Sequence, residues 1–215
     1  MDTIPNDMIS TIVAHVAKSS VADLFSLKQT CKMLYELGDD DFVLQQASLE
    51  KIPAVPWRLS DDAAYFLQRC QQTGNPEALF RLGMVEYFQN ARLELGLAFL
   101  ARAAYFGHVE ACYVLGIVLI CTDDHTRQEG MELLTIVEKC KKGSRCRQRI
   151  KMILRDLWLN HTFHPREPLC TDPGCSKAVH MSRRGWARDD DEEFDCEACK
   201  CDREVKLFCK GLRGN

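Results

Sequence analysis

Residues 74–83, Gly-Asn-Pro-Glu-Ala-Leu-Phe-Arg-Leu-Gly, return 33 positions later as residues 107–116, Gly-His-Val-Glu-Ala-Cys-Tyr-Val-Leu-Gly. Five of the ten positions are identical in the two copies. A repeat period in the thirties is typical of solenoids built from helical hairpins. The segment between the copies, residues 93–105, has apolar residues at helical spacing, so we expect each repeat to consist of a helix, a turn and a second helix.

Small residues mark the positions where the two helices of a hairpin should approach each other closely. A single hairpin cannot cover its own apolar face, so neighbouring helices must stack on it. We therefore expect a solenoid over residues 61–160, made of two hairpins with a flanking helix at each end. The small residues are Ala78, Gly83, Ala111 and Gly116, and the pair Gly96 and Leu100 reappears as Gly130 and Leu134.

The composition is that of an ordinary soluble protein of 215 residues, with a formal net charge of −3. This charge argues against a nucleic-acid partner, and a solvated helix face explains most of the basic stretch at residues 139–151. The longest apolar run, residues 113–121, is too short to span a bilayer, and residues 1–7 lack the build of a signal peptide. We expect no membrane association and a location in the cytoplasm, the nucleus or both.

The chain has twelve cysteines, and their distribution is uneven. Six are spread singly through the predicted helices, and six lie within the last 46 residues. Twelve cysteines in a small secreted chain would suggest disulfides. Without an export signal, this distribution favours a reducing compartment and a metal site near the end of the chain.

Cys170, Cys175, Cys196 and Cys199 form the pattern C-x4-C-x20-C-x2-C. Two thiolate pairs on short loops can converge on one tetrahedral zinc ion, although the x4 spacing is looser than in the commonest zinc ribbons. Two ions that share further ligands, and free or oxidised thiols, are the alternatives. Residues 165–212 are predicted to form a small zinc module. Its apolar content is thin, so we expect residues 168–209 to be ordered by zinc rather than by a core. Additional candidate ligands are Cys209, Cys201 and His180.

The first 48 residues predict three short helices. Asn6 or Asp7 can cap the first helix, and residues 20–23, Ser-Val-Ala-Asp, resemble a capping box that opens the second. On this pattern alone, the bundle could simply cap the solenoid. Residues 49–60 are predicted to be a linker, because Pro53 and Pro56 prevent a helix. The apolar stripe of the first helix is Met8, Ile9, Ile12, Val13 and Val16.

Three short stretches in residues 4–48 together resemble an F-box: Ile4-Pro5-Asn6-Asp7, then Val21-Ala-Asp-Leu24, then Cys31-Lys32. Ile4 replaces the usual leucine, and Leu34 stands where an aromatic residue is common. The resemblance implies docking to a Skp-type adaptor of a cullin–RING ubiquitin ligase. The positions that line the adaptor contact in that family are occupied here by Ile4, Pro5, Ile9, Leu24, Leu27 and Cys31.

Residues 103–111, Ala-Ala-Tyr-Phe-Gly-His-Val-Glu-Ala, followed by Leu115-Gly116, resemble the Sel-like branch of the tetratricopeptide repeats. Repeats of this class are scaffolds that hold a peptide or a protein. The order of F-box, helical repeats and terminal cysteines is similar to a plant family of F-box proteins with tetratricopeptide-like repeats. This wider resemblance also rests on Pro53-x-Val55-Pro56-Trp57 and Phe194-x-Cys-Glu-x-Cys199.

Taken with the resemblance, the sequence predicts an all-α substrate-receptor subunit of an SCF-type ubiquitin ligase, which bridges the Skp-type adaptor to an unidentified target protein. The alternative is a ligase-independent scaffold of helical repeats with a structural zinc module. We expect no enzymatic activity, since four cysteines would close the coordination sphere of zinc and leave no position for water.

Overall fold

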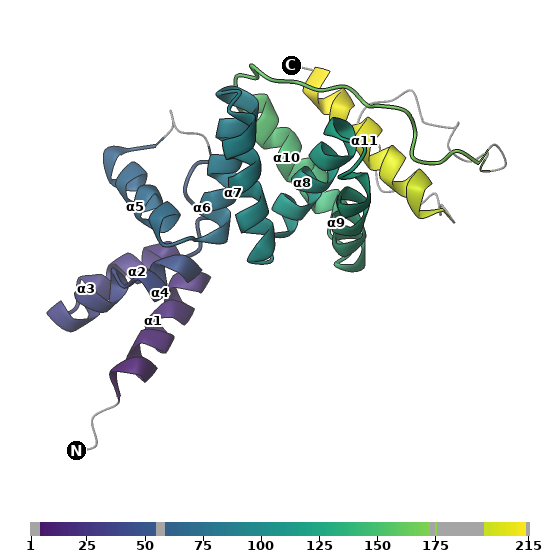
Figure 1. The fold of residues 1–215 in the computed structure, drawn as a ribbon. Coiled ribbons are helices and arrows are strands. Elements are labelled where there is room, and N and C mark those ends of the chain that lie inside the picture. Colours follow the sequence, from purple (N-terminus) through teal and green to yellow (C-terminus); the bar gives the residue numbers. More distant parts are fainter. Residues whose placement is uncertain (1–4, 55–58, 173–174, 176–195, 214–215) are drawn as a thin grey trace. The chain divides into compact units, whose positions relative to one another are not determined.

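The computed structural model describes residues 5–54, 59–172, 175 and 196–213. These residues form helices and connecting loops, and no strand occurs among them. The prediction of an all-α fold is confirmed. The chain divides into two compact units, Met1–Leu82 and Gly83–Asn215 (Figure 1).

The first unit contains the helices of the N-terminal bundle and the first helices of the repeat region. Ser20 caps one of them as predicted and Ser60 caps another, each accepting a hydrogen bond of 3.3 Å from the backbone amide three residues on. The second helix predicted in the bundle is split in two, because the backbone is extended at Cys31. The helices are α1 (Asn6–Ser19), α2 (Val21–Lys28), α3 (Lys32–Gly38), α4 (Asp41–Gln46), α5 (Asp61–Gln72) and α6 (Pro76–Met84).

The bundle and the start of the repeat region share one hydrophobic core. Burial of apolar side chains is the main favourable term in folding, so a shared core makes these helices stabilise one another. This core connects α1, α2 and α4 with α5 and the first turn of α6. Its buried members are Val13, Ala14, Ala17, Val21, Leu24, Val43, Leu44, Ala47, Leu49, Phe66, Leu67, Cys70 and Ala78.

Two buried polar side chains fasten the predicted linker and the end of α4 to α6. The Asn75 amide group donates 2.9 Å hydrogen bonds to the carbonyl oxygens of Leu44 and Ala47, and its oxygen caps α6. The Arg81 guanidinium donates to three carbonyl oxygens between residues 49 and 53, at 2.7–3.1 Å, and its Nε lies 2.5 Å from a carboxylate oxygen of Glu77. Residues 49–53 of the linker are therefore held by Arg81 of the repeat.

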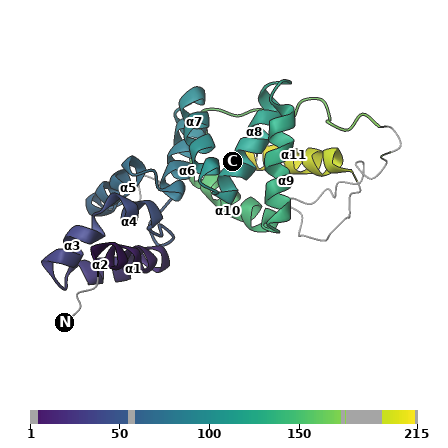
Figure 2. The ribbon, with the colours of Figure 1, turned by 60° about the horizontal axis from the view of Figure 1, so that its bottom comes forward.

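The second unit is built on helical hairpins whose glycines allow close contact, as the repeat predicts. A Cβ added to Gly96 would lie 2.7 Å from the backbone nitrogen of Tyr87, and one added to Gly116 would lie 2.9 Å from the carbonyl oxygen of Gly130. Helices α8 and α9 consequently lie side by side (Figure 2). The elements are the π-helical turn η2 (Val85–Gln89), α7 (Leu93–Tyr105), α8 (Val109–Thr122), α9 (Arg127–Lys139), α10 (Gly143–Asp156) and α11 (Glu197–Arg213).

The described part of the tail packs on the helices of the second unit. The extended segment after α10 is hydrogen-bonded to η2, since the amides of Asn160 and His161 both donate to the carbonyl oxygen of Phe88, at 2.9 and 3.0 Å. Phe208 of α11 is fully buried and stacks on Phe163, with 5.8 Å between ring centroids. The expectation that the tail lacks a core is therefore wrong, because the repeats supply aromatic partners for Phe208. That zinc contributes to its order stays a prediction.

Candidate functional site

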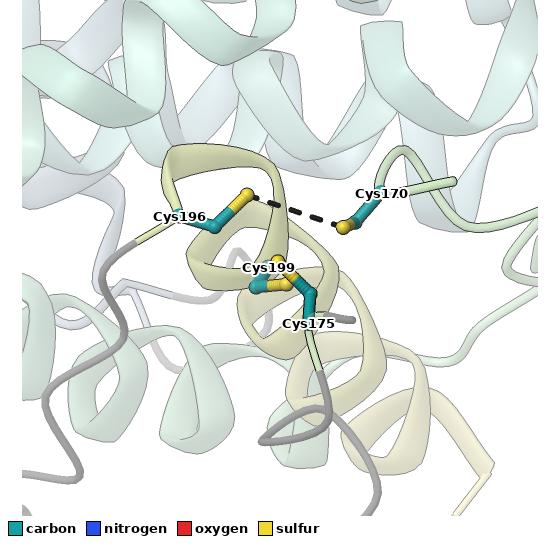
Figure 3. A group of neighbouring side chains, drawn as sticks. All are labelled: Cys170, Cys175, Cys196 and Cys199. Carbon is teal, nitrogen blue, oxygen red and sulfur yellow. Dashed lines mark hydrogen bonds between the residues drawn. The ribbon is translucent and has the colours of Figure 1, made fainter. Parts of the chain in front are cut away.

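The four cysteines of the predicted metal site converge from two parts of the chain. Cys170 and Cys175 follow the extended segment, while Cys196 and Cys199 lie at the start of α11 (Figure 3). A spacing of three residues places the latter two on one side of a helix. The four sulfur atoms all lie within 4.8 Å of one another, and those of Cys170 and Cys196 are 4.0 Å apart.

These separations fit a tetrahedral metal ion. Zinc–sulfur bonds of about 2.3 Å at tetrahedral angles place the sulfur atoms about 3.8 Å apart, so a small contraction would complete the site. Four thiolates fill the coordination sphere and leave no position for a catalytic water. The arrangement suits a structural ion that joins the extended segment to α11.

The electrostatic surroundings of the four thiols differ. The backbone amides of Cys199 and Ala198 at the start of α11 donate to the Cys196 sulfur, which lowers the pKa of that thiol. A hydrogen bond with Cys170 raises the pKa of Cys175 to about 11, and burial raises the pKa of Cys199 further. Because only thiolates bind zinc, an ion at this site would displace the protons that these thiols otherwise share.

The additional candidate ligands do not join this group. Burial raises the pKa of Cys201 to about 12, and this residue and Cys209 are both buried on α11, outside the four-cysteine group. The thiol of Cys209 instead contacts the buried Cys121 of α8, a hydrogen bond that raises the pKa of Cys121. His180 lies outside the described residues.

The residues predicted to contact an adaptor are distributed between the surface and the core of the bundle. Pro5 and Cys31 are exposed, and Ile9 and Leu27 are half-buried against the core. Leu24 has an exposed fraction of 0%, so it supports the bundle from inside and is not available as a surface contact. Ile4 lies outside the described residues.

Sequence reasoning missed the two most exposed apolar side chains of α1. Met8 and Ile12 were expected to face inward, but their exposed fractions are 58% and 53%, and Val13, Ala14 and Ala17 take the inward positions. The spacing of Pro5, Met8 and Ile12 places all three on the outward side of α1. The bundle also exposes Phe25, Met33, Tyr35 and Phe42. An outward helix side that carries apolar residues, as that of α1 does, is typical of an interaction surface.

Comparisons with known proteins agree with this architecture. A family model described as plant tetratricopeptide repeats matches residues 49–155. The chain is 36% identical over 139 residues to At1g67623, an Arabidopsis thaliana protein that is named as an F-box protein. It is 30% identical to two further Arabidopsis thaliana F-box proteins, At1g67340 and At5g50450. These alignments cover 65%, 55% and 53% of the chain. No solved structure matches it.

These findings support the resemblance to plant F-box proteins with helical repeats. The chain spans less than half the length of these three relatives, with 46%, 32% and 34% of them covered. Within the described residues, every helix is too short or too polar to cross a membrane.

Proposed function

We propose that the chain is the substrate-receptor subunit of an SCF-type cullin–RING ubiquitin ligase, and that its bundle binds a Skp-type adaptor. The observation that carries this proposal is the outward apolar side of α1, formed by Pro5, Met8 and Ile12. The similarity to the F-box proteins named above supports the same role. A soluble bundle gains stability by covering such side chains with a partner.

In this role the chain makes and breaks no covalent bond. It binds the adaptor through the first unit and a target protein through the second, and so raises the effective concentration of the target near the ligase. Exposed apolar side chains in the second unit are available for the target, among them Tyr105 and Phe106 at the end of α7. We assign the protein to the cytoplasm, the nucleus or both, where cullin–RING ligases act.

Adaptor binding can be tested with the full chain and a purified Skp-type adaptor. Met8→Glu combined with Ile12→Glu places two charges on the outward side of α1 without touching the core, and we expect the two proteins to stop co-purifying. Thr11→Glu is the matched control, because Thr11 is exposed on the flank of the same helix. Undiminished binding by the double variant, with helical content unchanged, would rule out this surface.

The second candidate is a ligase-independent scaffold whose bundle caps the repeats. The core shared by the bundle and the first repeat helices favours it, because such a core is what a capping element needs. Binding of the adaptor to the wild-type chain distinguishes the two candidate functions. A scaffold would leave the adaptor unbound in the wild-type chain, whereas a receptor binds it.

We further propose that Cys170, Cys175, Cys196 and Cys199 hold one structural zinc ion. The proximity of their sulfur atoms supports this. Elemental analysis of the purified chain should find about one zinc per chain, and Cys196→Ser should lose it. Cys140→Ser is the control, since Cys140 is an exposed cysteine on another helix end. A wild-type chain without metal after purification in zinc-containing buffer would refute the proposal.

A further inference from the structure

Asp202 connects α11 to the segment that carries Cys170. It follows Cys199 by three residues and therefore lies on the same side of the helix. One carboxylate oxygen accepts a 2.9 Å hydrogen bond from the amide of Leu169, and the other accepts a 3.2 Å hydrogen bond from the amide of Cys170. Its exposed fraction is only 7%. A carboxylate so far removed from water is stable only with partners, and these two amides are its partners.

The two hydrogen bonds of Asp202 hold residues 166–170, the metal loop, at their C-terminal end. Upstream, Arg127 donates to the carbonyl oxygen of Glu167 at 3.0 Å, and Arg166 donates to the carbonyl oxygen of Thr122 at 3.3 Å. Residues 166–170 are thus tied to the α8–α9 turn on one side and to α11 on the other. The backbone of Cys170 is fixed relative to the helix that carries Cys196 and Cys199.

We propose that Asp202 is a positioning residue that prepares the four-cysteine site for its metal. This inference rests on the proposed zinc site. Cys196 and Cys199 arrive together on α11, whereas Cys170 belongs to a separate segment and would have to be ordered when the ion binds. Asp202 orders it beforehand, so less conformational entropy is lost on binding. Partners that orient metal ligands typically change metal affinity about 10–100-fold.

A simpler explanation would be that any negative charge near a divalent cation strengthens its binding. Glu197 separates the two possibilities. It is exposed and adjacent to Cys196 in sequence, and no hydrogen bond joins it to the described part of the metal loop. Glu197→Gln removes the same charge as Asp202→Asn close to a ligand, but it leaves the two amide hydrogen bonds intact.

The test measures the zinc affinity of the metal-free full chain by competition with a chromophoric chelator, and the absorption spectrum of the Co²⁺-substituted protein. In Asp202→Asn the side-chain NH₂ group faces an amide donor, so at least one hydrogen bond is lost. We expect zinc affinity to fall about 10–100-fold and the Co²⁺–thiolate bands to weaken. Glu197→Gln should stay close to wild type, because exposed charges are screened.

Each of the other possible outcomes of this test supports one specific conclusion. Wild-type affinity in a folded Asp202→Asn chain would overturn the positioning role and leave the metal site intact. An equal loss in Glu197→Gln would replace positioning by a charge effect. Loss of helical content in Asp202→Asn under chelator would make Asp202 a general folding residue and also overturn the inference. A wild-type chain that binds no zinc would refute the metal site itself.

Discussion

Gly116 and Gly130 face each other across α8 and α9 so closely that a Cβ on Gly130 would lie 2.6 Å from the carbonyl oxygen of Gly116. A real Cβ cannot occupy that distance, and the obstacle is backbone rather than a flexible side chain. The two helices can therefore keep this contact only with glycine at both positions. The same relationship joins Gly96 to the backbone of Tyr87 in the preceding hairpin.

Gly130→Ala should consequently destabilise the second unit even though alanine is the better helix former. Forcing a methyl group into a filled contact typically costs about 1–3 kcal/mol. The free energy of unfolding, measured by urea denaturation, should fall by that amount. Gly143→Ala is the control, because the nearest atom to its added Cβ is the end of the Arg147 side chain at 3.4 Å. Equal stability of the two variants would contradict the close contact.

Arg81→Met should loosen the segment between α4 and α5. The substitution removes the donor for the carbonyl oxygens of Leu49, Ile52 and Pro53, and leaves the carboxylate of Glu77 without its cation. Breaking a buried pair of this kind typically costs about 3–5 kcal/mol. Hydrogen exchange of the amides in residues 49–54 should accelerate together with a lower unfolding midpoint. Lys32→Met, at the exposed ion pair with Glu36, should change little.

Phe208→Ala should detach α11 from the rest of the second unit, whether or not a metal ion is bound. Phe208 is fully buried among Phe88, Tyr113 and Phe163, and truncating a buried phenylalanine typically costs about 3–5 kcal/mol. Limited proteolysis should cleave α11 in the variant. Lys210→Ala, which changes an exposed residue of the same helix, should resist cleavage as the wild-type chain does. A wild-type tail that becomes fully protease-sensitive as soon as a chelator is added would instead show that the metal dominates.

His161 should contribute to acid sensitivity of the second unit. Burial lowers its pKa below the ordinary value of 6.5, so the folded state favours the neutral imidazole. The unfolded chain therefore binds the proton first, and the contribution to stability is complete above pH 6.5 and is lost as the pH falls below it.

His161→Phe keeps an aromatic ring against Tyr87, whose centroid lies 5.1 Å from the imidazole, and removes the titrating group. Its melting temperature should depend less on pH than that of wild type across this range. The comparison is made in chelator, so that acid release of a metal does not contribute. The exposed His125→Gln should behave like wild type.

Local features were predictable from the sequence. Ser20, Ser60 and Asn75 act on backbone groups two or three residues away, so a short pattern is sufficient to identify them. The close glycines and the four grouped cysteines were also predicted, because a repeat and a spacing rule specify them.

The contacts that the sequence did not predict are long-range or depend on helix rotation. Arg81 and Asp202 bind backbone groups about 30 positions away, and a backbone partner leaves no trace in residue type. Met8 and Ile12 were placed inward because five apolar residues on α1 cover too wide an arc to define one buried side. The burial of Phe208 depends on aromatic residues supplied by other elements, so the tail alone could not reveal it.

The hydrogen bonds of Asn75 limit how the N-terminal bundle can be exchanged between proteins in evolution. A foreign bundle joined to these repeats would have to present two carbonyl oxygens where Leu44 and Ala47 now lie, or leave a buried amide group without acceptors. Such a bundle is not an independently exchangeable domain. It depends on contacts with the first repeat, so chimaeras of related proteins should be joined after α6 rather than at the end of the bundle.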